Sequence, residues 1–215
     1  MQQSRNIITD FIDDYSNEPE GSEIARIRSL ELGLTPITPS TAACLTLFSK
    51  IGNVGNAVEI GTGSGVSALA LLAGMLPEAV LTSIDLDIEA QSAAREVFAS
   101  CQIAARRIRL IAGHPLEVLP KLNDSAYDLV FINGDPLEYV EYVAQADRLL
   151  KPAGTLLLHH AFWGGTVADA RNDDDEPLII REALDWIQTS SAYTSALFPI
   201  GDGLLVARRQ TSPLA

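Results

Sequence analysis

Short apolar segments recur through the middle of the chain, and longer segments with helical periodicity separate them. This alternation predicts strands joined by helices, which is typical of a parallel sheet covered by helices on both faces. The expected strands are 56–60, 79–85, 107–112, 127–133 and 154–160, and the expected helices are 64–75, 88–101, 115–121 and 137–150. We therefore expect an α/β fold with a doubly wound, mostly parallel sheet.

The two ends of the chain depart from this alternation. Further helices are expected over Pro19–Leu32, over Thr41–Ile51 with Ser40 as its N-cap, and over 177–188. The last helix leads to strands 193–199 and 204–208, which the Gly201-Asp202-Gly203 turn joins into an antiparallel hairpin. The expected organisation is a single domain over 1–215, with an N-terminal helical cap over 1–52 and a core over 56–209.

Composition narrows the classes of partner. The chain has 215 residues, a formal net charge of −13 and a pI near 4.5, and no cluster of Lys and Arg, which argues against nucleic acid. Cys44 and Cys101 lack the spacing of a disulfide framework or zinc site, so we expect two buried thiols in a reducing compartment. With no continuous apolar signal segment and no run long enough to span a bilayer, the sequence predicts a cytoplasmic protein without a membrane partner.

A glycine-rich turn follows the first expected strand. The segment Glu59-Ile60-Gly61-Thr62-Gly63-Ser64-Gly65 ends that strand and opens the next helix, so backbone N–H groups and a helix N-terminus can approach a ligand. Asp85 ends the second strand about 20 residues later, where an acid usually binds a ribose diol. Glu59 would lie beside a pyrophosphate, which disfavours NAD, whereas the ammonium of S-adenosylmethionine tolerates an acid and its carboxylate can meet N–H groups and Ser67. The pattern favours S-adenosylmethionine.

Chemistry-bearing residues stand at the carboxyl ends of the expected strands, where open parallel sheets bind their ligands. These residues are Glu59, Asp85, Gly113-His114, Asn133 with Asp135, and His159-His160. The set contains all three histidines of the chain. We expect one site at this edge of the sheet.

Several further segments support a resemblance in their order and spacing. They are Ile37-Thr38-Pro39, Tyr127-Asp128-Leu129-Val130-Phe131-Ile132, Leu149-Leu150-Lys151-Pro152, Trp163-Gly164-Gly165 and Pro199-Ile200-Gly201-Asp202-Gly203. With the glycine turn, they make residues 20–209 resemble a class I S-adenosylmethionine-dependent O-methyltransferase of the small bacterial branch related to catechol and caffeoyl-CoA methyltransferases.

The resemblance implies a Rossmann-like fold and roles for residues at matching positions. The methionine end of the cofactor would be held by Glu59, Gly61, Thr62, Gly63, Gly65 and Ser67. Asp85 would bind the ribose hydroxyls, and Leu86 would pack near the adenine, whose edge the backbone of Gly113 and His114 would border. Asn133 would lie closest to the sulfonium and the acceptor.

The chain departs from these relatives at their metal site. Relatives usually have a metal-binding Asp after the fourth strand, a Lys three residues later and an Asp-Asn pair after the fifth strand. The same positions here are Asn133, Pro136 and His159-His160. One amide and two imidazoles supply no negative charge for Mg²⁺ or Ca²⁺ unless Asp135 turns inward. We expect a metal-free site, with a transition metal on the imidazoles as the alternative.

Without a metal, the acceptor hydroxyl needs a base. His159 or His160 is the predicted base, because imidazole titrates near neutral pH, and Asn133 completes the predicted catalytic set. Trp163 and Phe162 are the expected wall of an aromatic acceptor site. The predicted reaction is methyl transfer to a hydroxyl of a small, aromatic molecule.

Two other interpretations remain open at this point. One is a protein that binds S-adenosylmethionine but has lost catalysis. The other is an NAD(P)-dependent oxidoreductase, against which stands the lack of a Tyr-x-x-x-Lys pair, since Val143 and Ala146 occupy the lysine positions. For assembly, relatives of this group are commonly dimers, and the N-terminal helices and the hairpin carry excess apolar residues, so we expect a homodimer.

Overall fold

The strands form one seven-stranded sheet in the order β3-β2-β1-β4-β5-β7-β6 in the computed structural model, which describes residues 7–211. The strands are β1 (Asn56–Ile60), β2 (Val80–Asp85), β3 (Ile108–Ala112), β4 (Tyr127–Ile132), β5 (Leu150–His159), β6 (Tyr193–Phe198) and β7 (Leu204–Arg209). β1 to β5 are parallel, and β7 pairs antiparallel with both β5 and β6. This confirms the expected mostly parallel sheet with a C-terminal hairpin.

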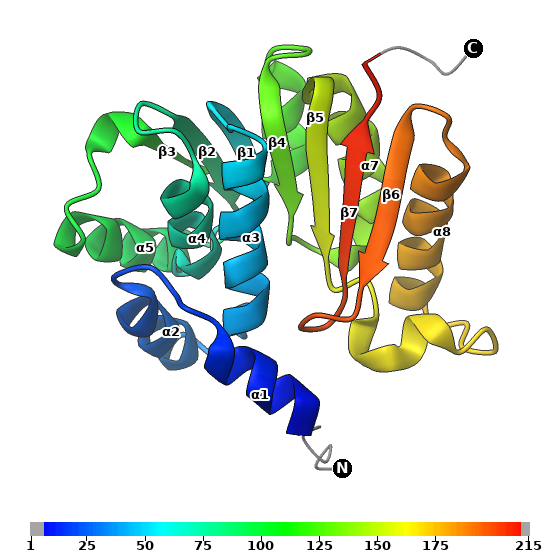
Figure 1. Ribbon diagram of the computed structural model, residues 1–215, viewed down its shortest axis with the longest axis horizontal. Coiled ribbons are helices and arrows are strands. Elements are labelled where there is room, and N and C mark those ends of the chain that lie inside the picture. The colour runs from blue at the N-terminus through cyan, green and yellow to red at the C-terminus, as the bar shows by residue number, and fades with distance from the viewer. Residues whose placement is uncertain (1–6, 212–215) are drawn as a thin grey trace.

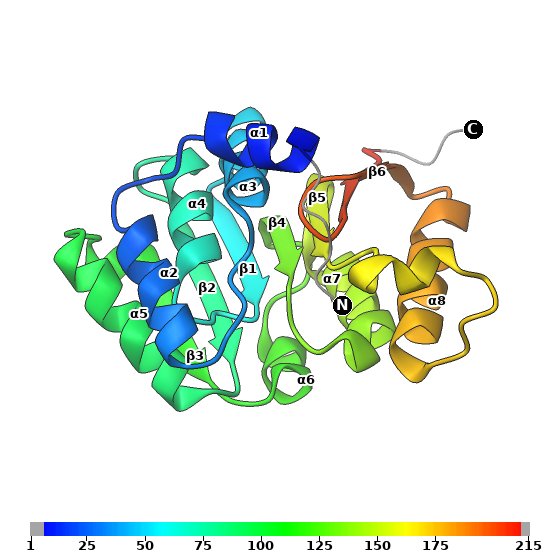
Figure 2. The same cartoon turned by 90° about the horizontal axis from the view of Figure 1, so that it is seen from below.

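Helices cover both faces of this sheet (Figures 1 and 2). They are α1 (Ile7–Tyr15), α2 (Ser22–Glu31), α3 (Pro39–Ile51), α4 (Val66–Gly74), α5 (Ile88–Ser100), α6 (Pro115–Val118), α7 (Tyr139–Leu149) and α8 (Asp175–Thr189), with 3-10 turns η1 (Ala105–Arg107), η2 (Leu119–Lys121), η3 (Pro136–Glu138) and η4 (Trp163–Ala168). The helices α3, α4 and α5 lie on one face and α6, α7 and α8 on the other. None of the helices in the described residues is long and apolar enough to cross a membrane.

The period of two along each strand divides the core between the faces. In β4, Leu129 and Phe131 belong to the cluster under α3, α4 and α5, while Val130 and Ile132 belong to the cluster under α7 and α8. All four side chains are fully buried. Because both faces are covered, β4 carries apolar side chains at consecutive positions from Leu129 to Ile132, as expected for a strand inside a parallel sheet.

The order of the strands reverses between β1 and β4. β1 pairs in parallel with β2 on one side and with β4 on the other, and Val58 is opposite Val130 in this register. Crossover connections leave the sheet in opposite directions at such a point, so a crevice opens beyond the carboxyl ends of the two strands. The expected site lies at this edge.

Two expectations about the N-terminal region were wrong in detail. The polar N-terminal segment, where no helix was expected, contains the helix α1. The helix α3 begins at Pro39, and its N-cap is Thr38 rather than Ser40. Thr38 fits this role because its side chain accepts the Thr41 N–H, and proline is favoured in a first turn.

Cys44 and Cys101 are partly exposed free thiols and not fully buried. The division into a cap over 1–52 and a core over 56–209 stays a prediction.

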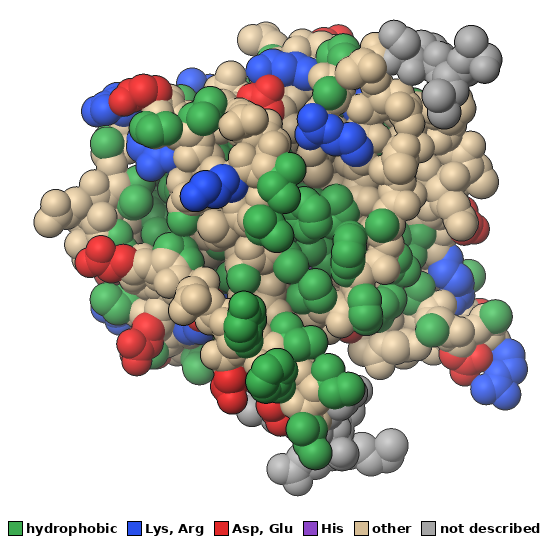
Figure 3. Space-filling view, viewed as in Figure 1, with side chains coloured by type: hydrophobic (Ala, Val, Ile, Leu, Met, Phe, Trp, Pro, Cys, Tyr) green, Lys and Arg blue, Asp and Glu red, His purple; other side chains and the backbone are tan. Residues whose placement is uncertain are grey.

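One broad face of the molecule carries exposed apolar side chains. Figure 3 shows them over α3 and the neighbouring strands of the hairpin, and along α1. They include Ile7, Phe11, Leu47, Ile51 and Leu197, each between 45% and 84% exposed. A contiguous apolar surface of this kind is typical of an interface.

Candidate functional site

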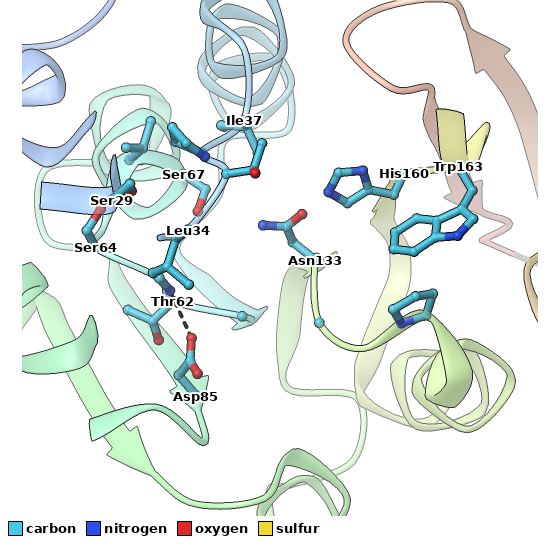
Figure 4. A pocket seen from close by; sticks show the side chains of 17 residues that line it. Ser29, Leu34, Ile37, Thr62, Ser64, Ser67, Asp85, Asn133, His160 and Trp163 are labelled. Carbon is cyan, nitrogen blue, oxygen red and sulfur yellow. Dashed lines mark hydrogen bonds between the residues drawn. The ribbon is translucent and has the colours of Figure 1, made fainter. Parts of the chain in front are cut away.

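A cleft of about 250 Å³ opens at the carboxyl ends of β1 and β4 (Figure 4). Its lining residues come from the glycine turn, from the loop after β4, from the end of β5 and from the segment between α2 and α3. They are Ser29, Leu34, Thr35, Pro36, Ile37, Gly61, Thr62, Gly63, Ser64, Val66, Ser67, Asp85, Asn133, Gly134, Pro136, His160 and Trp163. The cleft therefore joins residues from both halves of the sheet.

The backbone of the glycine turn packs directly against the backbone of the loop that follows β4. Gly61 has a φ of 93°, and a Cβ there would lie 2.3 Å from the carbonyl oxygen of Asn133, so only glycine fits. Gly65 has a φ of 95° and caps α4, and a Cβ there would lie 2.7 Å from the Phe98 ring. The turn thus places the N-terminus of α4 beside the cleft with no side chain at Gly61, Gly63 or Gly65.

Asp85 occupies the junction of two hollows. Its Oδ2 accepts the Gly63 N–H at 2.8 Å, which fixes the carboxylate beside the glycine turn. A second hollow of about 120 Å³ shares Gly61, Asp85 and Gly134 with the main cleft. The rest of its lining is Ile84, Leu86, His114, Pro115, Asp135, Glu138 and Tyr142. An elongated ligand can therefore occupy both hollows and pass Asp85 in its middle.

Glu59 lies beneath the glycine turn and does not line the cleft. Its side chain is fully buried, and its two oxygens accept hydrogen bonds from Ser67 and Ser83, both at 2.5 Å. Burial raises the pKa of this carboxyl to about 7, although the serine hydrogen bonds oppose the rise and Asp85 adds to it. Between Glu59 and the cleft stands Ser67, so contact of Glu59 with a ligand remains a prediction.

The two neighbouring histidines differ in environment. His159 ends β5 and is only 3% exposed; its Nδ1 lies 2.9 Å from Oδ1 of Asn133, and its Nε2 is buried and bonds to none of the residues 7–211. Burial and the neighbouring His160 lower the pKa of His159 to about 3, so this imidazole is neutral. His159 is not among the residues that line the cleft.

His160 faces the cleft because the strand breaks before it. A φ of 56° turns His160 out of β5, and its ring lines the cleft beside Trp163 (Figure 4). Its Nδ1 lies 2.9 Å from Oδ2 of Asp202, in the turn between β6 and β7. The hydrogen bond to Asp202 fixes the proton on Nδ1 and leaves Nε2 as an acceptor.

At the positions where the resemblance implies a metal site, the polar side chains are hydrogen-bonded within the protein. In the described part of the chain, no group of three or more His, Cys, Asp or Glu side chains is arranged to hold a metal ion. Asn133 and His159 bond to each other, and His160 bonds to Asp202. Nδ1 of each histidine and the amide oxygen of Asn133 are therefore engaged in hydrogen bonds within the protein.

The structure gathers most of the predicted site residues but not all of them. Gly61, Thr62, Gly63, Ser67, Asp85, Asn133 and His160 line the main cleft, and Leu86 and His114 line the second hollow. Glu59, Gly65, Gly113 and His159 lie outside both linings, and Phe162 packs against Gly203 instead of forming a wall. Sequence reasoning missed Asp202 as a partner of His160; the Gly201-Asp202-Gly203 turn was its only signal.

Comparisons with known proteins find relatives that are similar over most of the chain. A protein of Mycobacterium sp. (strain JLS) that is named as an O-methyltransferase is 43% identical over 185 residues, which cover 86% of this chain and 84% of that protein. A crystal structure of a protein from Corynebacterium glutamicum is 26% identical, with a TM-score of 0.88 over 95% of this chain and 96% of that chain.

A third similarity concerns the fold. The O-methyltransferase TomG of Streptomyces achromogenes, which takes part in tomaymycin synthesis and was crystallised with S-adenosylmethionine, has a TM-score of 0.87 at 22% identity over 98% of this chain and 99% of that chain. The family model described as O-methyltransferase matches residues 27–210, which is most of the chain. The resemblance expected from the sequence is thereby confirmed, and the chain belongs to the O-methyltransferase family.

Proposed function

We propose that the protein transfers a methyl group from S-adenosylmethionine to a hydroxyl of a small aromatic acceptor. The observation that carries the proposal is the position of Asp85, at the junction of the two hollows. S-adenosylmethionine has its ribose between a methionine chain and an adenine, so a carboxylate in the middle of an elongated site matches it. Membership of the O-methyltransferase family favours this reaction over the nicotinamide-dependent alternative.

The residues present fit such a cofactor. In the main cleft, Ser67 and the N-terminal end of α4 would hold the methionine carboxylate, and Asp85 would accept the ribose hydroxyls. In the second hollow, Leu86 and His114 would lie against the adenine. The bound cofactor supplies a methyl group already activated by a sulfonium.

The acceptor side of the cleft is aromatic and lacks cations. Trp163 offers a ring face or edge, and His160 and Asn133 offer polar atoms beside it. None of the described residues that line the cleft is Lys or Arg. The expected acceptor is therefore a neutral phenol, without phosphate or carboxylate groups.

His160 is the proposed base for the acceptor proton. Its ring lines the cleft, whereas His159 is buried, is bonded to Asn133 and lies outside the lining. General-base residues must reach the proton that they remove, and only His160 of the two predicted histidines meets this condition. Asn133 is proposed to orient the acceptor.

The test measures cofactor binding and turnover separately. We expect the purified protein to bind S-adenosylmethionine in calorimetry, and Asp85→Ala to weaken binding roughly 10- to 150-fold, since a charge-assisted hydrogen bond is worth about 1.5–3 kcal/mol. Asp173→Ala, at an exposed acid before α8, is the matched control and should leave binding unchanged. Turnover is followed as S-adenosylhomocysteine released with a panel of neutral phenols.

Two results would contradict the proposal. Equal affinities of Asp85→Ala and wild type would remove Asp85 from the cofactor site. Binding without release of S-adenosylhomocysteine, with any phenol and with or without divalent ions, would support the catalytically degenerate alternative.

We further propose that two copies associate through the apolar face of α1, α3 and the hairpin. The exposed apolar residues of this face, which include Ile7 and Leu197, would be buried against the same surface of a second copy. Light scattering at micromolar concentration should give twice the mass of the chain, and Leu47→Asp with Ile51→Asp should give the single mass. A wild-type monomer at these concentrations would refute this assembly.

The cytoplasm is the proposed location. Cys44 and Cys101 are both free, which fits a reducing compartment. Fractionation of cells that express the tagged protein should recover it with cytoplasmic markers, and recovery with the periplasmic or membrane fraction would contradict the proposal.

A further inference from the structure

The two carboxylate oxygens of Asp202 form hydrogen bonds with different groups, one at the end of β5 and one in the loop that follows. Oδ2 lies 2.9 Å from Nδ1 of His160, and Oδ1 accepts the Gly164 N–H at 2.8 Å. The backbone is fixed as well, since the carbonyl of Asp202 accepts the Phe162 N–H at 2.9 Å. Three hydrogen bonds therefore hold the turn between β6 and β7 against residues 160–164.

The ring of His160 is confined by its other neighbours. The His159 ring lies at a centroid distance of 4.0 Å, and the Trp163 ring meets His160 edge-on at 5.6 Å. His160 and Trp163 both have positive φ, at 56° and 45°. Side chains adopt this region at a cost, and such strain is concentrated at functional sites. The local backbone is built to present this ring to the cleft.

One nitrogen of the ring is left for chemistry. Nδ1 belongs to Asp202, and no described residue bonds Nε2, which belongs to a side chain that lines the cleft. A carboxylate on one imidazole nitrogen selects the tautomer in which the other nitrogen accepts a proton.

Building on the proposed methyl transfer, we propose that Asp202 is a positioning residue, which orients His160 and stabilises its protonated form. In this proposal the pair does what a metal ion and a lysine would do in the relatives that the sequence resembles. In the proposed step, the acceptor O–H bond breaks and its proton passes to Nε2 of His160. The oxygen forms the bond to the methyl carbon, and the electron pair of the carbon–sulfur bond remains on sulfur. The proton then leaves His160 for water through the open cleft.

The charges around His160 agree with this role. Burial alone would raise the pKa of Asp202, but the hydrogen bonds from His160 and Gly164 and the nearby histidines hold it below its ordinary value. His159 is neutral, because burial and His160 lower its pKa to about 3. Tyr139, the first residue of α7, lies within electrostatic range of Asp202 and Asp135, and Asp85 lines the same cleft as His160. Asp202 is the one carboxylate among them that touches the ring.

Kinetics of Asp202→Asn test the role. Asparagine keeps an oxygen for the Gly164 N–H, so the fold of the turn should survive. We expect kcat to fall about 100-fold with KM changed by less than about threefold, because the step loses a stabilised proton acceptor. The lower pH limit of activity should move down by about one pH unit, since loss of the negative charge disfavours imidazolium. Asp173→Asn, at an exposed acid before α8, is the control and should keep the wild-type profile.

A second readout is independent of turnover. The chain has three histidines, so nitrogen-15 spectra of the imidazoles can be assigned with His114→Gln and His160→Gln. Wild-type His160 should carry its proton on Nδ1, and Asp202→Ala should shift the proton toward Nε2. This result stands even if no phenol proves to be an acceptor, which would overturn the proposed function alone.

Three outcomes would overturn the pair. They are an Asp202→Asn profile with only a lower plateau and no shift along the pH axis, an unchanged tautomer in Asp202→Ala, and loss of wild-type turnover in EDTA that Mg²⁺ or Mn²⁺ restores. Either of the first two outcomes would leave Asp202 with only a structural role in the turn. The third would assign the chemistry to a metal.

Discussion

Replacing Glu59 with glutamine should remove a dependence of stability on pH that this one buried carboxyl imposes. The folded protein holds the Glu59 pKa at about 7 against an ordinary value of 4.5, mainly because of burial. Below pH 4.5 the group is neutral in both states and contributes nothing. Between pH 4.5 and about 7 the unfolded chain releases this proton before the folded protein does, so stability falls as pH rises. Above about pH 7 the full cost is present.

The size of the effect follows from the pKa difference. A rise from 4.5 to about 7 corresponds to about 3 kcal/mol, because each pH unit is worth about 1.4 kcal/mol. Glutamine keeps an oxygen and an N–H for Ser67 and Ser83, so the altered hydrogen bonds add an offset that does not depend on pH. The stability difference between Glu59→Gln and wild type should therefore increase by about 3 kcal/mol from pH 4.5 to pH 8 in favour of the variant.

Urea unfolding without cofactor, repeated at half-unit steps of pH, measures this difference. Glu141→Gln, at an exposed acid on α7, is the control and should follow the wild-type curve at every pH. If the curves of Glu59→Gln and wild type stay parallel, folding does not raise the pKa of Glu59 and the burial argument fails.

Three further variants test other parts of the structure. Gly61→Ala should abolish cofactor binding in calorimetry, because the added Cβ would lie 2.3 Å from a backbone oxygen of Asn133; wild-type affinity would show that the turn opens freely. Thr38→Ala should lower the free energy of unfolding by about 1 kcal/mol through loss of the α3 cap, and an unchanged urea midpoint would contradict that role. Burial alone would raise the pKa of Asp128, but hydrogen bonds from Lys151 and two backbone N–H groups lower it. The stabilisation from the ionised Asp128 is thus present above about pH 4 and is lost as pH falls. Asp128→Asn should therefore lower the free energy of unfolding by about 1 kcal/mol at pH 7 and by less at pH 3, and a pH-independent difference would refute this.

Periodicity predicts the sheet well because burial on both faces imposes it. Every expected strand exists, and most boundaries differ from the structure by one or two residues. The largest error is β5, which begins at Leu150, because pairing of Leu150 with Tyr127 extends the strand backward past Pro152. The helix α1 was missed because Ile7, Ile8 and Phe11 face solvent, so its apolar residues mark no core face.

The site was predictable where it follows from the ends of strands. Asp85 and Asn133 could be placed because parallel strands finish at one edge, and chain order alone brings them together. The pairing of His160 with Asp202 joins residues 42 positions apart through the hairpin, and no local pattern reports it. The different environments of His159 and His160 depend on one backbone angle after β5, which composition does not encode.

The close approach at Gly61 has a consequence for how this scaffold diversifies. Because the glycine turn rests directly on the backbone of Asn133, main-chain atoms set the spacing between the two halves of the cleft at this contact. Side chains on η4 and on the segment from Leu34 to Ile37 can then vary without changing that spacing. Descendants of such a chain can acquire new acceptors by substitution of wall residues, while the distance between the cofactor side and the acceptor side of the cleft stays the same.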